Sequence, residues 1–188
     1  MIAATVAGAP VSTTEVDARE AVLRSSAQAA ALPRPHTSEG RQLRRWLTQV
    51  LVTERVVARE AEALGVVVTA ATPDEYTVLP DLTSRLEIGS IAAGALADPL
   101  ARALYAHVTA GIDVADDAVI DYHRRNPHRF ASDSEVDAVR QIAEMLRGAA
   151  SRRAFRHWLD QRRAALVWLA PGYEHPGDPR QPDNVHRH

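Results

Sequence analysis

Tyrosine and histidine side chains occur in pairs on two segments that are predicted to be helical. Tyr105 and His107 share one segment, and Tyr122 and His123 share another. A tyrosine beside a histidine could transfer protons, as in general acid–base catalysis. The same residues also serve as packing groups at the boundary of a core, and we take packing as their default role.

A run of basic side chains surrounds Asn126-Pro127, where the second of these helices should end. The run consists of His123, Arg124, Arg125, His128 and Arg129. Guanidinium groups could hold a phosphate or a carboxylate with paired hydrogen bonds. Positive charge at the end of a helix also complements the helix dipole without any ligand, and we favour that interpretation. The arginine pairs Arg44-Arg45 and Arg162-Arg163 are likewise predicted to lie on solvated helix faces.

The end of the chain carries three imidazoles among carboxylates, and the predicted metal ligands are His175, His186 and His188. Imidazole and carboxylate groups bind zinc, nickel or copper well. Ligands on an unsupported tail lack the outer hydrogen bonds that fix a metal site. The default prediction is therefore no cofactor, with a divalent metal as the alternative.

Aromatic side chains at helical spacing supply the remaining candidates for binding. Trp46, Phe155 and Trp158 lie at the spacing of apolar helical positions, which makes core packing their first role and a peptide-binding groove their second. The complete set of predicted ligand-binding residues is Trp46, Tyr105, Tyr122, His123, Arg125 and Trp158.

Several reaction classes are excluded or disfavoured by the residues that are missing. The chain has no cysteine, which excludes thiolate catalysis, disulfides and cysteine-based zinc sites. All 22 basic residues are arginine, so no lysine can form a Schiff base or serve a phosphate-binding loop. Nucleophile-elbow, dinucleotide-binding and zinc-protease motifs do not occur. We therefore predict no catalytic residue.

Composition indicates one mostly α-helical domain over residues 1–170, followed by an extended tail over 171–188. The 188 residues are 46% hydrophobic but only 5% aromatic, and small aliphatic side chains suit closely packed helices. A net charge of −2 argues against a nucleic-acid partner. The sequence has no secretory signal and no apolar run long enough to span a membrane, so we expect a cytoplasmic protein. Its arginine and alanine bias is typical of a high-GC bacterial genome.

Local signals place the first elements. Residues 2–6 and the segment at Val11 should form two strands joined by a turn at Gly8, and Ser12 and Glu15 have the spacing of a helix-capping box. The first helix should run to about residue 31. A second helix, with Thr37 and Ser38 as candidate caps, should end at Gly65.

The later elements are also mainly helical. We expect a short helix opening at residues 72–75 with Pro73 in its first position, and helices over about 81–97, 98–110 and 114–125. A last helix should begin at Ser134, with a kink or break at Gly148, and give way to a strand over 165–169.

The order of these motifs resembles SurA-type chaperones and parvulin-type prolyl isomerases. Residues 6–17, Val-Ala-Gly-Ala-Pro-Val-Ser followed by Glu-Val-Asp, are similar to the opening of that family. Residues 47–66 resemble its long helix, residues 119–130 the end of its helical module, and residues 152–167 its returning helix. His123 stands where the family usually has a second tyrosine.

The resemblance implies a helical peptide-binding module whose two chain ends meet, with residues 2–6 and 166–169 paired as strands around a shared core. The parvulin isomerase domain, which normally follows the helical module, is absent, because Ser134 comes almost directly after Phe130. We therefore expect a non-catalytic chaperone-like module that binds a peptide or protein client. The alternative is a small enzyme or accessory protein of bacterial specialised biosynthesis that uses histidines or a metal, and a homo-oligomer with a structural role is a third hypothesis.

Overall fold

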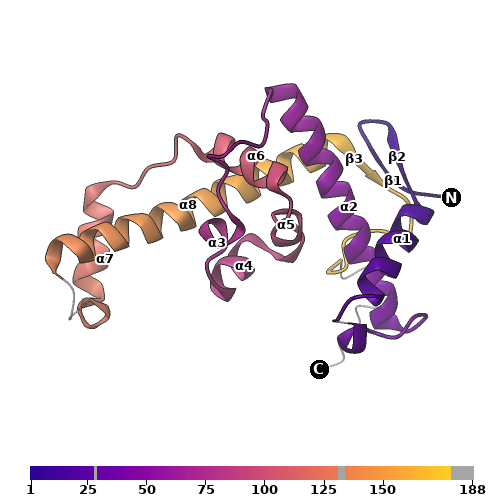
Figure 1. Ribbon diagram of the computed structural model, residues 1–188, viewed down its shortest axis with the longest axis horizontal. Helices are drawn as coiled ribbons and strands as arrows, with labels where there is room; N and C mark the ends of the chain where they lie inside the picture. Colours follow the sequence, from indigo (N-terminus) through magenta and orange to yellow (C-terminus); the bar gives the residue numbers. More distant parts are fainter. Residues whose placement is uncertain (28, 131–133, 179–188) are drawn as a thin grey trace. The chain divides into compact units, whose positions relative to one another are not determined.

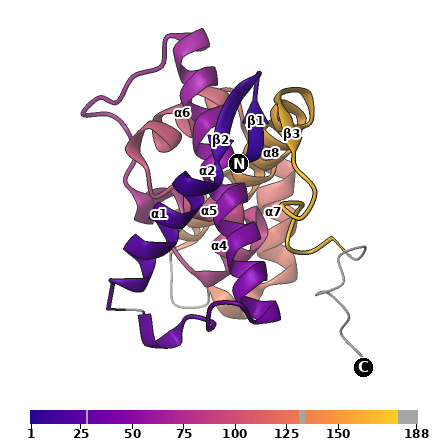
Figure 2. The same cartoon turned by 90° about the vertical axis from the view of Figure 1, so that its right-hand side faces the viewer.

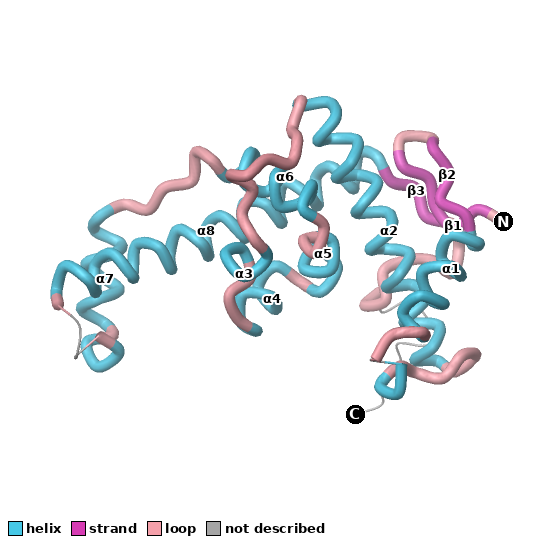
Figure 3. The backbone as a smooth tube through the Cα atoms, in the orientation of Figure 1, coloured by secondary structure: helices cyan, strands magenta, loops and turns pink. Residues whose placement is uncertain are grey.

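The protein is mostly α-helical with a small antiparallel sheet made by its two ends, as predicted (Figures 1 and 3). The computed structural model describes residues 1–27, 29–130 and 134–178. The strands are β1 (Ile2–Val6), β2 (Ala9–Ser12) and β3 (Val167–Leu169). The α-helices are α1 (Thr13–Arg24), α2 (Ser38–Leu64), α3 (Glu75–Val78), α4 (Leu82–Ile88), α5 (Ser90–Ala95), α6 (Pro99–Thr109), α7 (Asp116–Arg125) and α8 (Glu135–Leu166).

The chain divides into two compact units. Unit 1 comprises Met1–Gly65 and Asp160–His188, and unit 2 comprises Val66–Leu159. Unit 1 is therefore built from both ends of the chain, whereas unit 2 is one continuous segment. Whether the two behave as the single domain expected over residues 1–170 stays a prediction.

The sheet of unit 1 has β1 as its middle strand, between β2 and β3 (Figure 2). Val6 pairs with Ala9 across a two-residue turn, Ala7-Gly8, in which both φ angles are positive, as tight hairpin turns require. On the other side of β1, Val6 pairs with Val167. The predicted pairing of the chain ends is thus confirmed.

Helix caps in unit 1 follow the sequence signals. The Ser12 hydroxyl accepts from the backbone N–H of Glu15, whose carboxylate accepts in return from the Ser12 N–H at 2.8 Å. Thr37 caps α2 by accepting from the N–H of Gly40, and Gly65 closes α2 in the left-handed conformation. These three caps confirm the capping box and both predicted ends of the long helix.

The core of unit 1 forms where α1 and α2 meet the sheet. Ala3, Val16 and Leu47 are fully buried together. Around them pack the partly buried side chains of Leu23, Leu43, Trp46, Leu51 and Tyr173. Trp46 therefore serves in core packing, the first of the two roles considered for it.

Helices are the regular secondary structure in the described residues of unit 2, and Phe155 is fully buried there. Ile88, Leu96, Leu104 and Ile142 are buried in the same unit. The Arg152 guanidinium, itself buried, donates from Nε and Nη2 to Glu87 Oε2 at 3.1 and 3.0 Å. This ion pair ties α8 to α4.

Several element boundaries differ from the sequence prediction. The strand expected over 165–169 begins only at Val167, because α8 continues to Leu166. The first helix ends at Arg24 rather than near residue 31, because the hydroxyls of Ser25 and Ser26 bond the carbonyls of Val22 and Leu23 and satisfy the last turn; a separate 3₁₀ turn follows at Ala29–Ala31. The helix expected over 81–97 is split into α4 and α5 by Gly89, whose φ is +88°. The short helix predicted with Pro73 in its first position instead begins at Glu75, and Asp74 caps it.

Gly148 does not break the last helix, since α8 is continuous through it. A Cβ atom at position 148 would lie 3.2 Å from Arg152 Nη1. The glycine therefore makes room for the buried guanidinium rather than ending the helix.

Replacement of Ser12 by alanine should lower the free energy of unfolding by about 1 kcal/mol, because one N–H in the first turn of α1 loses its acceptor. Chemical denaturation of Ser12→Ala beside wild type measures this. Thr14→Ala, at an exposed position of the same turn, is the matched control and should leave stability nearly unchanged. Equal effects of the two substitutions would contradict the capping role of Ser12.

Candidate functional site

Two of the predicted ligand-binding residues meet in unit 2. The rings of Tyr105 and Phe155 lie edge to face with centroids 5.2 Å apart, and Trp158 stacks on Phe155 at 5.7 Å. Burial raises the pKa of the Tyr105 phenol above its usual range, so the phenol stays protonated at neutral pH. His107 is exposed, two residues further along the same helix, and residues at this spacing do not face each other.

Three other predicted residues gather near the end of α7. The rings of Tyr122 and His123 lie edge-on to Phe130, at 6.4 and 6.0 Å. The Tyr122 hydroxyl accepts from Arg129 Nη1 at 2.7 Å. Exposed Arg125 donates from Nε to the carbonyl of Asp121 at 3.1 Å, which is how a cation satisfies the end of a helix.

Trp46 belongs to unit 1, so the structure groups it with neither of these clusters. His175 also belongs to unit 1, where its Nδ1 accepts from the N–H of Gly177 at 3.0 Å. Partial burial and the nearby Arg163 charge lower the pKa of His175. His186 and His188 lie outside the described residues, and no group of three potential metal ligands occurs within them. The metal site stays a prediction.

Only one member of each arginine pair departs from the predicted solvated helix face, since Arg162 is exposed and Arg44 partly exposed. Arg45 is only 4% exposed, and Arg163 donates to the Gln49 carbonyl at 3.2 Å and to the Gln49 and Thr53 side chains. Burial lowers the pKa of Arg163. Arg162 pairs with Glu60 at 3.1 Å.

Arg45 belongs to a buried stripe along α2 that helical periodicity could have revealed. Its members recur at intervals of three and four residues and are Arg45, Gln49, Val52, Val56 and Glu60. The sequence prediction followed the apolar positions alone and therefore missed the polar members.

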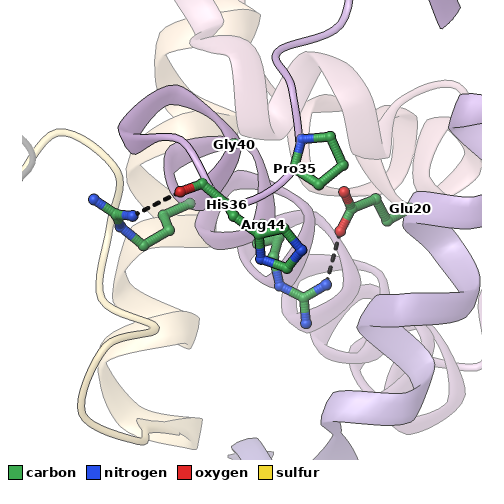
Figure 4. A pocket seen from close by; sticks show the side chains of 6 residues that line it. Glu20, Pro35, His36, Gly40 and Arg44 are labelled. Carbon is green, nitrogen blue, oxygen red and sulfur yellow. Dashed lines mark hydrogen bonds and ion pairs between the residues drawn. The ribbon is translucent and has the colours of Figure 1, made fainter.

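A pocket of about 310 Å³ lies in unit 1, and the sequence analysis did not identify it (Figure 4). Helix α1 contributes Glu20, and the loop before α2 contributes Pro35 and His36. The first turns of α2 contribute the other lining residues, Gly40, Arg41 and Arg44. The pocket thus forms where the loop folds back over the start of α2.

Ion pairs join the charged side chains at this pocket. Arg44 bonds Glu20 Oε2 at 2.7 Å and Asp17 Oδ1 at 2.6 Å, and Arg24 bonds Glu20 Oε1 at 2.7 Å. Burial alone would raise the pKa of Glu20, but its bonds to the two guanidinium groups outweigh burial and lower the pKa. Burial would likewise lower the pKa of Arg44, and its bonds to Asp17 and Glu20 instead raise the pKa.

Backbone constraints shape the same pocket. His36 has a φ of +67°, and its carbonyl accepts from Arg41 Nη1 at 3.2 Å. A Cβ at Gly40 would lie 2.3 Å from the Arg34 carbonyl oxygen, so only glycine lets the loop approach the helix this closely. The charged residues that line the pocket include the ion pair of Glu20 and Arg44.

An exposed apolar face on α4 is the second feature that the sequence analysis missed. Leu82 and Leu86, one helical turn apart, are 70% and 71% exposed. Ser84 and Ile88 on the opposite side of α4 are buried. Arg85, between the leucines in sequence, pairs with Glu75 of α3 at 2.7 Å. That ion pair joins α4 to the helix that carries Tyr76, which is 75% exposed.

Comparisons with known proteins match only the start of the chain. Residues 2–39 match the model of a family of unknown function (DUF7158). That segment covers β1, β2, α1 and the loop leading into α2. No curated protein and no solved structure matches the chain. No helix within the described residues has the length and apolar character needed to cross a membrane.

Gly40→Ala should lower the free energy of unfolding by roughly 1–3 kcal/mol, because the methyl group overlaps a backbone oxygen that cannot rotate away. Chemical denaturation measures the loss. Gly111→Ala is the matched control, since a Cβ there has no neighbour within 4 Å and should be tolerated or slightly stabilising. If Gly40→Ala proves as harmless as the control, the close approach of the loop to α2 is wrong.

Glu20→Gln should destabilise the protein by about 2 kcal/mol at neutral pH, because Arg24 and Arg44 lose their shared carboxylate. The native-state pKa of Glu20 is lowered, so its contribution is complete above the pKa of an unfolded glutamate and is lost as pH falls through the lowered value. The gap in stability between wild type and Glu20→Gln should therefore narrow on acidification below about pH 4. Denaturation midpoints of both proteins, measured from about pH 3 to about pH 7, test this. A difference in stability that stays constant over this range would contradict the role given to Glu20.

Proposed function

We propose that this chain is a non-catalytic, chaperone-like module that binds a peptide or protein segment through the exposed apolar face of α4 formed by Leu82 and Leu86. The observation that carries the proposal is the two-sided apolar character of α4. Ile88 supplies its buried side, while its leucines lie in solvent. A helix that is apolar on both sides is normally buried on both, so the outer side of α4 is suited to a partner.

The energetics of such a face favour reversible binding. Covering apolar area contributes about 25 cal/mol per Å², and the ordering of a bound segment offsets part of this gain. Two large exposed side chains therefore support modest affinity for an apolar stretch, which is what a module with many clients requires.

Kinship with the helical module of SurA-type and parvulin-type proteins is part of the proposal. Pairing of β1 with β3 supports it, because that resemblance implied meeting chain ends. The placement of Trp46 and Trp158 in different units gives no support for the shared core that the resemblance also implied. Within this proposal the protein is bacterial and cytoplasmic, acts on peptide or protein clients rather than nucleic acid, and needs no isomerase domain.

The test uses the full chain and a model client that aggregates on heating. Wild type should suppress the aggregation, and the double variant Leu82→Ser/Leu86→Ser should lose most of that effect, because the apolar face is removed. Both positions are exposed, so the free energy of unfolding should change by no more than about 0.5 kcal/mol per site. Val136→Ser, at another exposed position of unit 2, is the matched control and should behave like wild type.

Two results would count against the proposal. Wild type that leaves aggregation of the client unchanged would exclude chaperone-like activity toward it, and a double variant as active as wild type would remove α4 as the binding face.

A further inference from the structure

The sheet of unit 1 ends in two chemically different edges. Its strand order is β2-β1-β3, so β2 and β3 are the outer strands (Figure 2). An edge strand presents backbone N–H and C=O groups that can pair with another chain, and proteins usually block such groups.

The β2 edge is blocked. Pro10, which pairs with Thr5, has no N–H to offer. The N–H of Ser12, two residues on, donates to Glu15 Oε2 in the capping box. An incoming strand would therefore find neither of these donors available along β2.

The β3 edge is open. The N–H of Ala7 donates to the Leu166 carbonyl at 2.7 Å, and that of Ala170 donates to the Ala3 carbonyl at 3.0 Å. These bonds frame the pair Thr5–Trp168, so Trp168 is the β3 residue whose backbone faces β1. By the alternation of antiparallel strands, the carbonyl of Val167 and both backbone groups of Leu169 face away from β1. Within the described part of the chain, no further strand pairs with them.

The side chains of β3 indicate what could bind there. Trp168 is 56% exposed on one face of the strand, while Val167 and Leu169 are half-buried on the other. A strand added beside β3 would place one residue directly opposite Trp168, and aromatic and β-branched residues make the most favourable cross-strand neighbours.

We propose that the outer edge of β3 binds an extended peptide segment by strand addition, with an aromatic or β-branched residue opposite Trp168. The occupant is an extended backbone because the free groups of the edge are main-chain donors and acceptors. A second copy pairing β3 with β3 would join only three residues on each side, far short of the roughly 1,200 Å² that stable protein interfaces bury. The site lies in unit 1 and uses main-chain bonds, so it goes beyond the apolar face of α4.

The decisive experiment uses unmodified full-length protein and a fluorescein-labelled seven-residue peptide with a Val-Tyr-Val centre and charged ends. Two N-methylated forms of this peptide differ only in which alternate amides are blocked. Only one set of amides can face β3, so fluorescence anisotropy should give affinities for the two forms that differ by about tenfold or more. Equal affinities, or no binding of the unmethylated peptide, would overturn the proposal.

A pair of protein variants provides the reciprocal test. Leu169→Pro removes the outward N–H and should weaken peptide binding about tenfold, whereas Leu169→Ala keeps that N–H and should bind within about threefold of wild type. The α4 double variant should bind this peptide like wild type, so the strand-addition site and the proposed α4 function can fail separately. Concentration-dependent dimerisation that Leu169→Pro abolishes would assign the edge to a second copy and overturn the proposal.

Discussion

Pairing between the two ends of the chain is the constraint on which unit 1 depends. β1 begins at the second residue, β3 ends at Leu169, and Val6 lies opposite Val167. Joining segments so distant in sequence costs chain entropy, although that cost grows only slowly with loop length. Side-chain hydrogen bonds near the strands also hold the two chain ends together. Arg163 donates to Gln49 and Thr53 on α2. Gln49 Nε2 in turn donates to the Tyr173 carbonyl at 2.8 Å.

The pairing of the chain ends also explains how the chain is divided into two units. Unit 1 takes residues from both ends, so unit 2 is a continuous segment that leaves unit 1 after Gly65 and returns to it at Asp160. Its core is made of contacts within that segment, such as Arg152 with Glu87 and Phe155 with Tyr105. A continuous segment of this kind can change in length or surface chemistry while the strand pairing of unit 1 is kept.

Local signals predicted local structure well. The Ser12–Glu15 capping box, the Gly65 cap and the periodicity of α2 each depend on residues within a few turns of one another, and all three are present. The pocket could not be read in this way, because Arg44 meets Asp17 and Glu20 across more than 20 residues of sequence. The exposure of Leu82 and Leu86 is likewise set by the fold rather than by any local signal in the sequence.

Some charged side chains of this protein are buried and some large apolar side chains are exposed. This distribution affects which kinds of partner the protein could bind. Arg45 and Arg152 are buried and Arg44 is engaged by two carboxylates, whereas Leu82 and Trp168 are in solvent. Binding that depends on charge, such as that of a polyanion, weakens steeply with salt. Apolar burial and main-chain hydrogen bonds are far less sensitive to screening. Binding at the proposed α4 face or the proposed β3 edge would therefore depend on the apolar groups and extended conformation of the partner rather than on its charge.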